Sequence, residues 1–109
     1  MTIAQISKVC ATFTKTTKGH HSPYVILLSD ALGAPGVYVG MTGLDPLERF
    51  AQHCRGERAG AGIVQDYGQT ILLDACAHLT GCSEAEARRL EFELAQALEL
   101  AGFAVFGGH

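Results

Sequence analysis

The pattern of apolar and polar residues along the chain predicts a small sheet with helices between its strands. Residues 22–29 form a continuous apolar run, which is typical of a strand buried on both sides. Residues 37–39 predict a second strand, antiparallel to the first, after an Ala-Pro-Gly turn within residues 30–36. Residues 70–77 predict a third strand in the interior of the sheet, and residues 103–106 predict a short closing strand.

A helix after the second strand has clear start and stop signals. Asp45 can accept hydrogen bonds from the first-turn amides, Pro46 has the φ angle of a first helical position, and Gly56 ends the helix. Arg49 and His53 lie one turn apart on one face of this helix. From their spacing alone, this face is interpreted as an ordinary polar face exposed to solvent. The other face carries the side chains predicted to contact the core, which are Leu47, Phe50, Ala51 and Cys54.

The last long helix begins at a capping box formed by Ser83 and Glu86, and Gly102 ends it. Its apolar stripe consists of Ala87, Leu90, Leu94, Leu98 and Ala101. Glu91 lies at the border of that stripe, where a carboxylate can face a cleft and remain ionised beside a cation. The alternative interpretation is a surface ion pair with Arg88.

The first 21 residues predict a basic N-terminal extension. Its apolar spacing indicates a short helix, and the alternation over residues 10–17 indicates an edge strand after it. The segment contains no acidic residue, and its basic side chains are Lys8, Lys15, Lys18, His20 and His21. The two adjacent histidines are interpreted as part of a solvated loop.

Length and charge limit the classes of function. A chain of 109 residues predicts one domain, with a core in residues 22–106. The net charge of −3 argues against strong non-specific binding of nucleic acid through bulk charge. A small basic patch is the alternative, because Arg55 and Arg58 follow Arg49 closely. The glycine-rich residues 56–62 are interpreted as a flexible connector, with a phosphate-wrapping loop as the alternative.

Cysteine usage favours a reduced, cytoplasmic protein. The four cysteines form no Cys-x-x-Cys pair, and no secretory signal precedes them. Their spacing is not that of a zinc finger or ribbon. No apolar stretch is long enough for a transmembrane helix, so no membrane partner is expected.

The order of residues in the first half resembles the GIY-YIG nuclease signature. Tyr24 opens the first strand, the second strand ends in Tyr38-Val39-Gly40, and the following helix carries Arg49. Further on, Glu86-Ala87-Arg88-Arg89-Leu90-Glu91 matches the acidic-alanine step and leucine-glutamate pair of that family. The resemblance covers approximately residues 22–98.

The resemblance implies an α/β (α+β) fold with a small mixed, mainly antiparallel sheet of three to four strands flanked by helices. It also implies a metal-dependent endonuclease that hydrolyses phosphodiester bonds in DNA. In that interpretation a tyrosine is the general base, with Tyr24 favoured over Tyr38 and the choice between them left open by the sequence. The other tyrosine positions water or phosphate, Arg49 binds the phosphate, and Glu91 holds one Mg²⁺ or Mn²⁺ ion. His53 is an auxiliary phosphate contact or proton carrier. Gly40, Arg55 and Arg58 are candidate substrate-binding residues.

Two departures from the family pattern keep other interpretations open. Met41 stands where many members carry a lysine, and the asparagine that many members carry after the glutamate has no counterpart. One alternative is a non-catalytic module of the same fold that binds nucleic acid or a protein partner. Another is an unrelated α/β subunit of a homo-oligomer with both tyrosines in its core. For a nuclease of this size, selectivity would come from a partner, a homodimer or the structure of the DNA.

Overall fold

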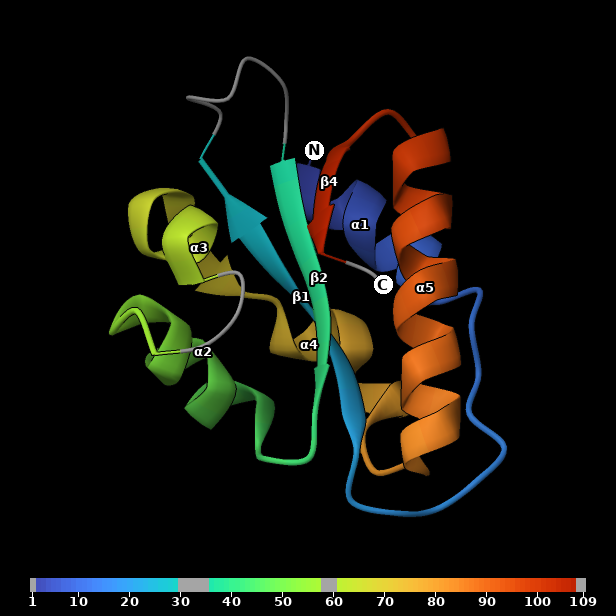
Figure 1. The fold of residues 1–109 in the computed structure, drawn as a ribbon. Helices are drawn as coiled ribbons and strands as arrows, with labels where there is room; N and C mark the ends of the chain where they lie inside the picture. The colour runs from blue at the N-terminus through green and yellow to red at the C-terminus, as the bar shows by residue number, and fades with distance from the viewer. Residues whose placement is uncertain (1, 30–35, 58–60, 108–109) are drawn as a thin grey trace.

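The chain folds into a four-stranded sheet with helices on both faces (Figure 1). The computed structural model describes residues 2–29, 36–57 and 61–107. The elements in chain order are α1 (Thr2–Cys10), β1 (Ser22–Leu28), β2 (Gly36–Thr42), α2 (Pro46–Cys54), α3 (Ala61–Tyr67), β3 (Gly68–Ile71), α4 (Leu73–Cys76), η2 (Ala77–Leu79), α5 (Glu84–Leu100) and β4 (Ala104–Gly107). The predicted turn over residues 30–35 lies outside the described residues, as does Arg58.

The strand order is β3-β1-β2-β4. β1 pairs antiparallel with β2 and with β3, whereas β2 and β4 are parallel. The predicted mixed, mainly antiparallel sheet is therefore confirmed, and so are the first, second and closing strands. β4 pairs only with residues 36–39 of β2, and in the described part of the chain no strand pairs with the same edge over residues 40–42.

Alternate residues of the central strands face two separate cores. Val25, Val37 and Val39 belong to the larger core, under α1, α4 and α5. Tyr24 and Ile26 face the smaller core under α2 and α3 (Figure 1). β1 is thus buried on both sides, as its continuous apolar run predicts.

The predicted helix ends are present. Asp45 Oδ1 accepts a hydrogen bond of 3.0 Å from the amide of Leu47, and Ser83 Oγ accepts one of 3.1 Å from the amide of Glu86. Gly56 follows α2 with a φ of +76°, a left-handed conformation that glycine adopts without steric cost. Of the apolar stripe on α5, Ala87, Leu90, Leu94 and Leu98 are buried, whereas Ala101 caps the helix and is exposed.

The prediction of one interior strand over residues 70–77 is wrong. β3 ends at Ile71, α4 begins at Leu73, and β3 lies at the edge of the sheet. A short apolar run does not distinguish a buried strand from a buried helical turn, because a run of a few apolar residues shows neither the period of a strand nor that of a helix. Here Ala75 and Cys76 reach the larger core from a helix.

The N-terminal segment differs from its prediction in two ways. Its helix is present as α1, but no strand follows it, because the amides of Thr16 and Thr17 donate to the Glu86 carboxylate at 2.8 Å each. In addition, Ile6 and Cys10 are fully buried in the larger core. Part of the segment predicted as an extension is therefore integral to the fold.

Candidate active site

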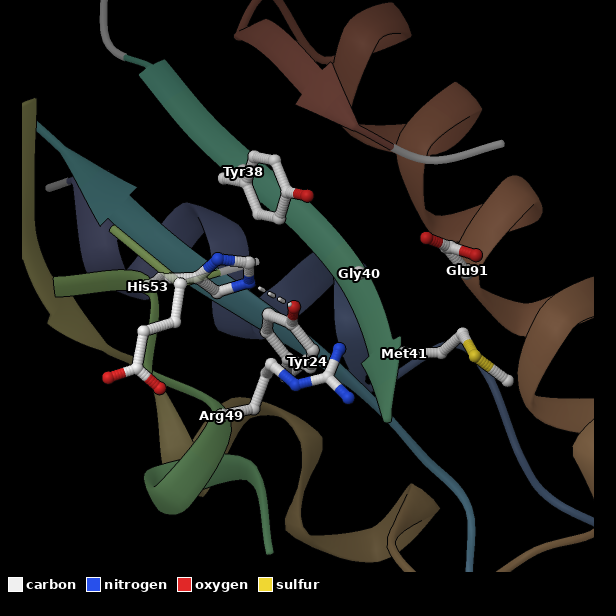
Figure 2. Close-up of a pocket in the computed structure, with 8 residues that line it drawn as sticks. Tyr24, Tyr38, Gly40, Met41, Arg49, His53 and Glu91 are labelled. Atoms are coloured by element: carbon white, nitrogen blue, oxygen red, sulfur yellow. Dashed lines mark hydrogen bonds between the residues drawn. The ribbon is translucent and has the colours of Figure 1, made fainter. Parts of the chain in front are cut away.

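A pocket of about 390 Å³ lies where the edge of β2 is unpaired. Its lining residues come from β1, β2, α2, α5 and the segment after α2 (Figure 2). They are Tyr24, Tyr38, Gly40, Met41, Arg49, His53, Glu57 and Glu91. The structure thus brings together Tyr24, Tyr38, Arg49, Glu91, His53 and Gly40, all of which the sequence singled out.

The two tyrosines lie on the same face of the hairpin. Tyr24 pairs with Gly40 across the strands, and Tyr38 pairs with Ile26, so the tyrosine rings are diagonal neighbours with centroids 6.4 Å apart. A Cβ atom at Gly40 would lie 2.5 Å from the Tyr24 hydroxyl oxygen. Gly40 therefore allows the Tyr24 ring to lie flat across β2.

The orientation of α2 is the largest difference from the predicted site. His53 is only 1% exposed, and its Nε2 lies 2.9 Å from the Tyr24 hydroxyl (Figure 2). Of the side chains predicted to face the core, Phe50 packs partly buried against the smaller core, whereas Leu47 is 52% exposed and Cys54 is also exposed. The helix turns its polar face inward because the hydroxyl on the sheet offers the imidazole a hydrogen-bond partner, which an apolar sheet face would not.

Arg49 lies beside Tyr24 in the pocket (Figure 2). Its Nε atom is buried and makes no hydrogen bond within the described residues. A planar guanidinium is suited to bidentate contact with the oxygens of a phosphate. Arg49 is thus the pocket residue best suited to an anionic ligand.

Both tyrosine hydroxyls keep their protons at neutral pH. Burial raises the pKa of Tyr24 well above its ordinary value, Tyr38 and Glu91 add to the rise, and Arg49 opposes it. Burial also raises the pKa of Tyr38, again with Glu91 adding to the rise and Arg49 opposing it. A positively charged ligand in the pocket would favour the phenolates, as Arg49 does.

Glu91 extends from α5 on the opposite side of the unpaired β2 edge from Arg49 and Tyr24 (Figure 2). It is 8% exposed, which agrees with its predicted position at the rim of the core. The pocket therefore reaches around the edge of β2 and joins side chains that belong to opposite faces of the sheet.

The donor set is compatible with a hard divalent ion bound mostly through water. Glu91 and Glu57 are the carboxylates that line the pocket. Within residues 2–29, 36–57 and 61–107, no group of three or more His, Cys, Asp or Glu side chains is arranged to hold a metal. Mg²⁺ needs only one or two protein carboxylates because it retains several waters, whereas a structural zinc site needs four protein ligands.

Two of the predicted substrate-binding residues are not among the pocket residues described. Arg55 is exposed and pairs with Glu57 at 2.6 Å and with Glu48 at 3.9 Å. Arg58 lies outside the described residues. Glu57 lines the pocket although nothing in the sequence marked it, since it follows Gly56, where helical periodicity no longer sets the direction of a side chain.

The four cysteines are free, with Cys54 exposed and the other three buried. No helix in the described part of the chain has the length and apolar character needed to cross a membrane.

Comparisons with protein-family models, curated proteins and solved structures find no match to this chain.

Proposed function

We propose that this protein is a metal-dependent endonuclease that hydrolyses phosphodiester bonds in DNA. The observation that supports this most strongly is the shared pocket of Tyr24, Tyr38, Arg49, His53 and Glu91. These residues come from four separate elements, and they include each catalytic residue implied by the resemblance to GIY-YIG nucleases.

Arg49 binds the scissile phosphate in this proposal. Its guanidinium is fixed in charge and donates two parallel hydrogen bonds to phosphate oxygens, which neutralises charge that builds up in the transition state. Tyr38, whose ring lies 5.3 Å from that of His53, orients the phosphate or the attacking water from the neighbouring strand.

The proton of the attacking water leaves through Tyr24 and His53. As the Tyr24 oxygen takes a proton from water, its own hydroxyl proton passes to His53 Nε2 over the 2.9 Å hydrogen bond. This requires the neutral His53 tautomer whose Nε2 is free of hydrogen. The transfer avoids forming a free phenolate, which the raised pKa of Tyr24 disfavours.

Glu91 would hold the divalent ion, with Glu57 as the other carboxylate of the pocket. When bound, such an ion supplies positive charge to the phosphate oxygens and to the leaving oxygen. Glu91 stands across the pocket from Arg49, so the phosphate would have a positive centre on each side of the β2 edge.

A non-catalytic module that binds nucleic acid or a protein partner is the second candidate. Met41 supports it, because this thioether lines the pocket where many GIY-YIG nucleases carry a lysine. Without that lysine, Arg49 and His53 are the basic residues among the described lining residues.

The deciding experiment is cleavage of plasmid and branched DNA with Mg²⁺ or Mn²⁺. The variants are Glu91→Gln and Arg49→Lys, and Glu99→Gln is the matched control because Glu99 is an exposed carboxylate on the same helix. We expect metal-dependent cutting that falls about 100-fold or more in each site variant and is unchanged in the control.

Cutting that persists in Glu91→Gln would reject the proposed site. DNA binding without cutting by the native protein would favour the non-catalytic module instead. Neither cutting nor DNA binding would leave a protein-binding module or an unrelated fold as the remaining candidates.

A further inference from the structure

A second carboxylate, that of Glu57, lines the pocket after the end of α2. Gly56 turns the chain there with a φ of +76°, and the Glu57 amide donates to the carbonyl of Gln52 at 3.0 Å. The helix that carries Arg49 therefore also sets the position of residue 57. The Glu57 side chain is 48% exposed, so water and salt screen its charge only in part.

The pocket without an ion has more negative than positive charge in its walls. Among the described residues that line it, Arg49 is the permanent cation, whereas Glu57 and Glu91 are carboxylates. His53 adds no charge in the neutral tautomer that the proposed proton transfer requires. The ion-free pocket is therefore net negative, although its proposed ligand is a phosphate.

The Tyr38 hydroxyl experiences this imbalance. Burial is the largest cause of its raised pKa, and the charge of Glu91 raises that pKa by more than the charge of Arg49 lowers it. Arg49 alone therefore leaves the surroundings of this hydroxyl unfavourable for an anion.

Arg55 contacts Glu57 from outside the pocket. Its Nε lies 2.6 Å from Glu57 Oε2, and its Nη2 lies 3.5 Å from Glu57 Oε1 and 3.9 Å from Glu48 Oε1. Glu57 is a lining residue and Arg55 is not among those described, so the negative member of the pair is the one that borders the ligand. Because Coulomb energies fall with distance, Arg55 offsets only part of the Glu57 charge inside the pocket.

We infer that Glu57 makes DNA binding at this pocket depend on the divalent ion. Without the ion, its carboxylate repels a phosphate at Arg49. Its charge also draws the ion into the pocket, and the bound ion then outweighs the carboxylates and attracts the phosphate. This rests on the proposed nuclease function, which supplies both the phosphate at Arg49 and the ion at Glu91.

The first test measures DNA binding in EDTA, where no ion is present and no metal-dependent cutting occurs. Labelled single-stranded and branched oligonucleotides are titrated with Glu57→Gln, with Arg55→Gln/Glu57→Gln, and with Glu99→Gln, which removes an exposed carboxylate of α5 outside the pocket. We expect Glu57→Gln to bind several-fold more tightly than the native protein. Glu99→Gln should match the native protein.

The double variant separates the position of a charge from the net charge. Arg55→Gln/Glu57→Gln removes one charge of each sign, so its net charge equals that of the native protein. It should still bind DNA more tightly in EDTA, because the charge that it removes from the pocket wall is the negative one. Weaker binding than the native protein would mean that Arg55 itself contacts DNA, and would overturn the inference.

The second test measures Mn²⁺ binding without DNA, from the electron paramagnetic resonance signal of the free ion. We expect Glu57→Gln to bind Mn²⁺ several-fold more weakly than the native protein and Glu99→Gln to bind it equally well. Equal Mn²⁺ affinity of the two variants would overturn the role of Glu57 in linking DNA binding to the ion.

These outcomes are separate from those of the cleavage experiment. If Glu57→Gln binds DNA in EDTA no more tightly than Glu99→Gln, or if neither binds, the inference is overturned and the nuclease proposal is still decided by cutting. If both expected results are obtained but the native protein cuts no DNA, the dependence on the ion stands for a non-catalytic DNA-binding pocket and the nuclease proposal fails.

Discussion

Tyr24 and His53 are both almost completely buried, and the hydrogen bond between them joins β1 to α2 at the pocket. His53→Gln retains a hydrogen-bonding side chain but has no group that accepts a proton at neutral pH. We expect metal-dependent cleavage of plasmid DNA to fall about 10²- to 10⁴-fold. Urea unfolding of the same variant measures how much of the loss is structural.

The pH profile distinguishes a proton carrier from a packing residue at position 53. Acid protonates the imidazole and removes its capacity to accept, so the native protein should lose activity on the acidic side of its profile. His53→Gln should have little activity at any pH and no such acidic limb. If the variant keeps the native profile at reduced amplitude, His53 only positions Tyr24.

Gly40 is the residue whose replacement should harm the site more than the fold. In Gly40→Ala the new Cβ would meet the Tyr24 hydroxyl at 2.5 Å, so the ring must move. We expect a stability loss of about 1–3 kcal/mol and about a 100-fold loss of activity from the misplaced hydroxyl. Gly62→Ala is the control, because a Cβ there meets nothing within 4 Å. Equal activity of the two variants would contradict this account of Gly40.

At the scale of elements, Glu86 fixes the start of α5 to the segment before β1. Its carboxylate accepts from the amides and hydroxyls of Thr16 and Thr17 and from Arg89 Nη2. The Thr17 hydroxyl contributes most to lowering the pKa of Glu86, and the other Thr16 and Thr17 donors also lower it, from the usual 4.5 to about 2, with burial opposing them.

This lowered pKa predicts how stability depends on pH. The ionised carboxylate stabilises the fold fully above pH 4.5, and its contribution is lost as the pH falls from 4.5 towards 2. Urea midpoints across this window should fall more steeply for the native protein than for Glu86→Gln. Parallel curves would mean that the threonine contacts do not favour the ionised form.

Sequence reasoning succeeded for elements where the determining interactions are local. The side-chain caps at Asp45 and Ser83 depend on residues within one turn, and both form. The second half of the predicted capping box does not form, because the Ser83 amide donates to the Thr17 hydroxyl and the Glu86 carboxylate accepts from Thr16 and Thr17. Sequence reasoning failed where the partner is distant in sequence. The inward face of α2 is set by Tyr24, and the path of residues 11–21 is set by Glu86, which the sequence marked only as part of a capping box.

The same distinction applies to the site. Tyr24, Tyr38, Arg49 and Glu91 were identified through their order along the chain, and the sheet register and α5 bring them together. The 2.9 Å contact of His53 and the position of Glu57 had no sequence signal, because both depend on how α2 and the segment after it pack against the sheet.

At the scale of the whole molecule, the net charge of −3 repels the DNA backbone. Each positively charged side chain near the pocket therefore accounts for a larger share of the binding free energy. Met41→Lys adds one at the pocket wall. We expect several-fold tighter DNA binding and a salt slope steeper by about 1. Met41→Leu, similar in size and uncharged, should bind like the native protein. If lysine and leucine have the same effect, the pocket does not contact phosphate.

The burial of Ile6 and Cys10, together with the Glu86 contacts to Thr16 and Thr17, affects how this protein can be dissected. A shortened chain starting at Ser22 would match the extent of the family resemblance, yet it would lack two core side chains and the donors that hold the first turn of α5. Loss of DNA binding in that fragment would report on folding rather than on substrate contact. Point substitutions at exposed positions are therefore more informative than truncation. Proteins tagged at the N-terminus and at the C-terminus should both be assayed before a negative result is interpreted.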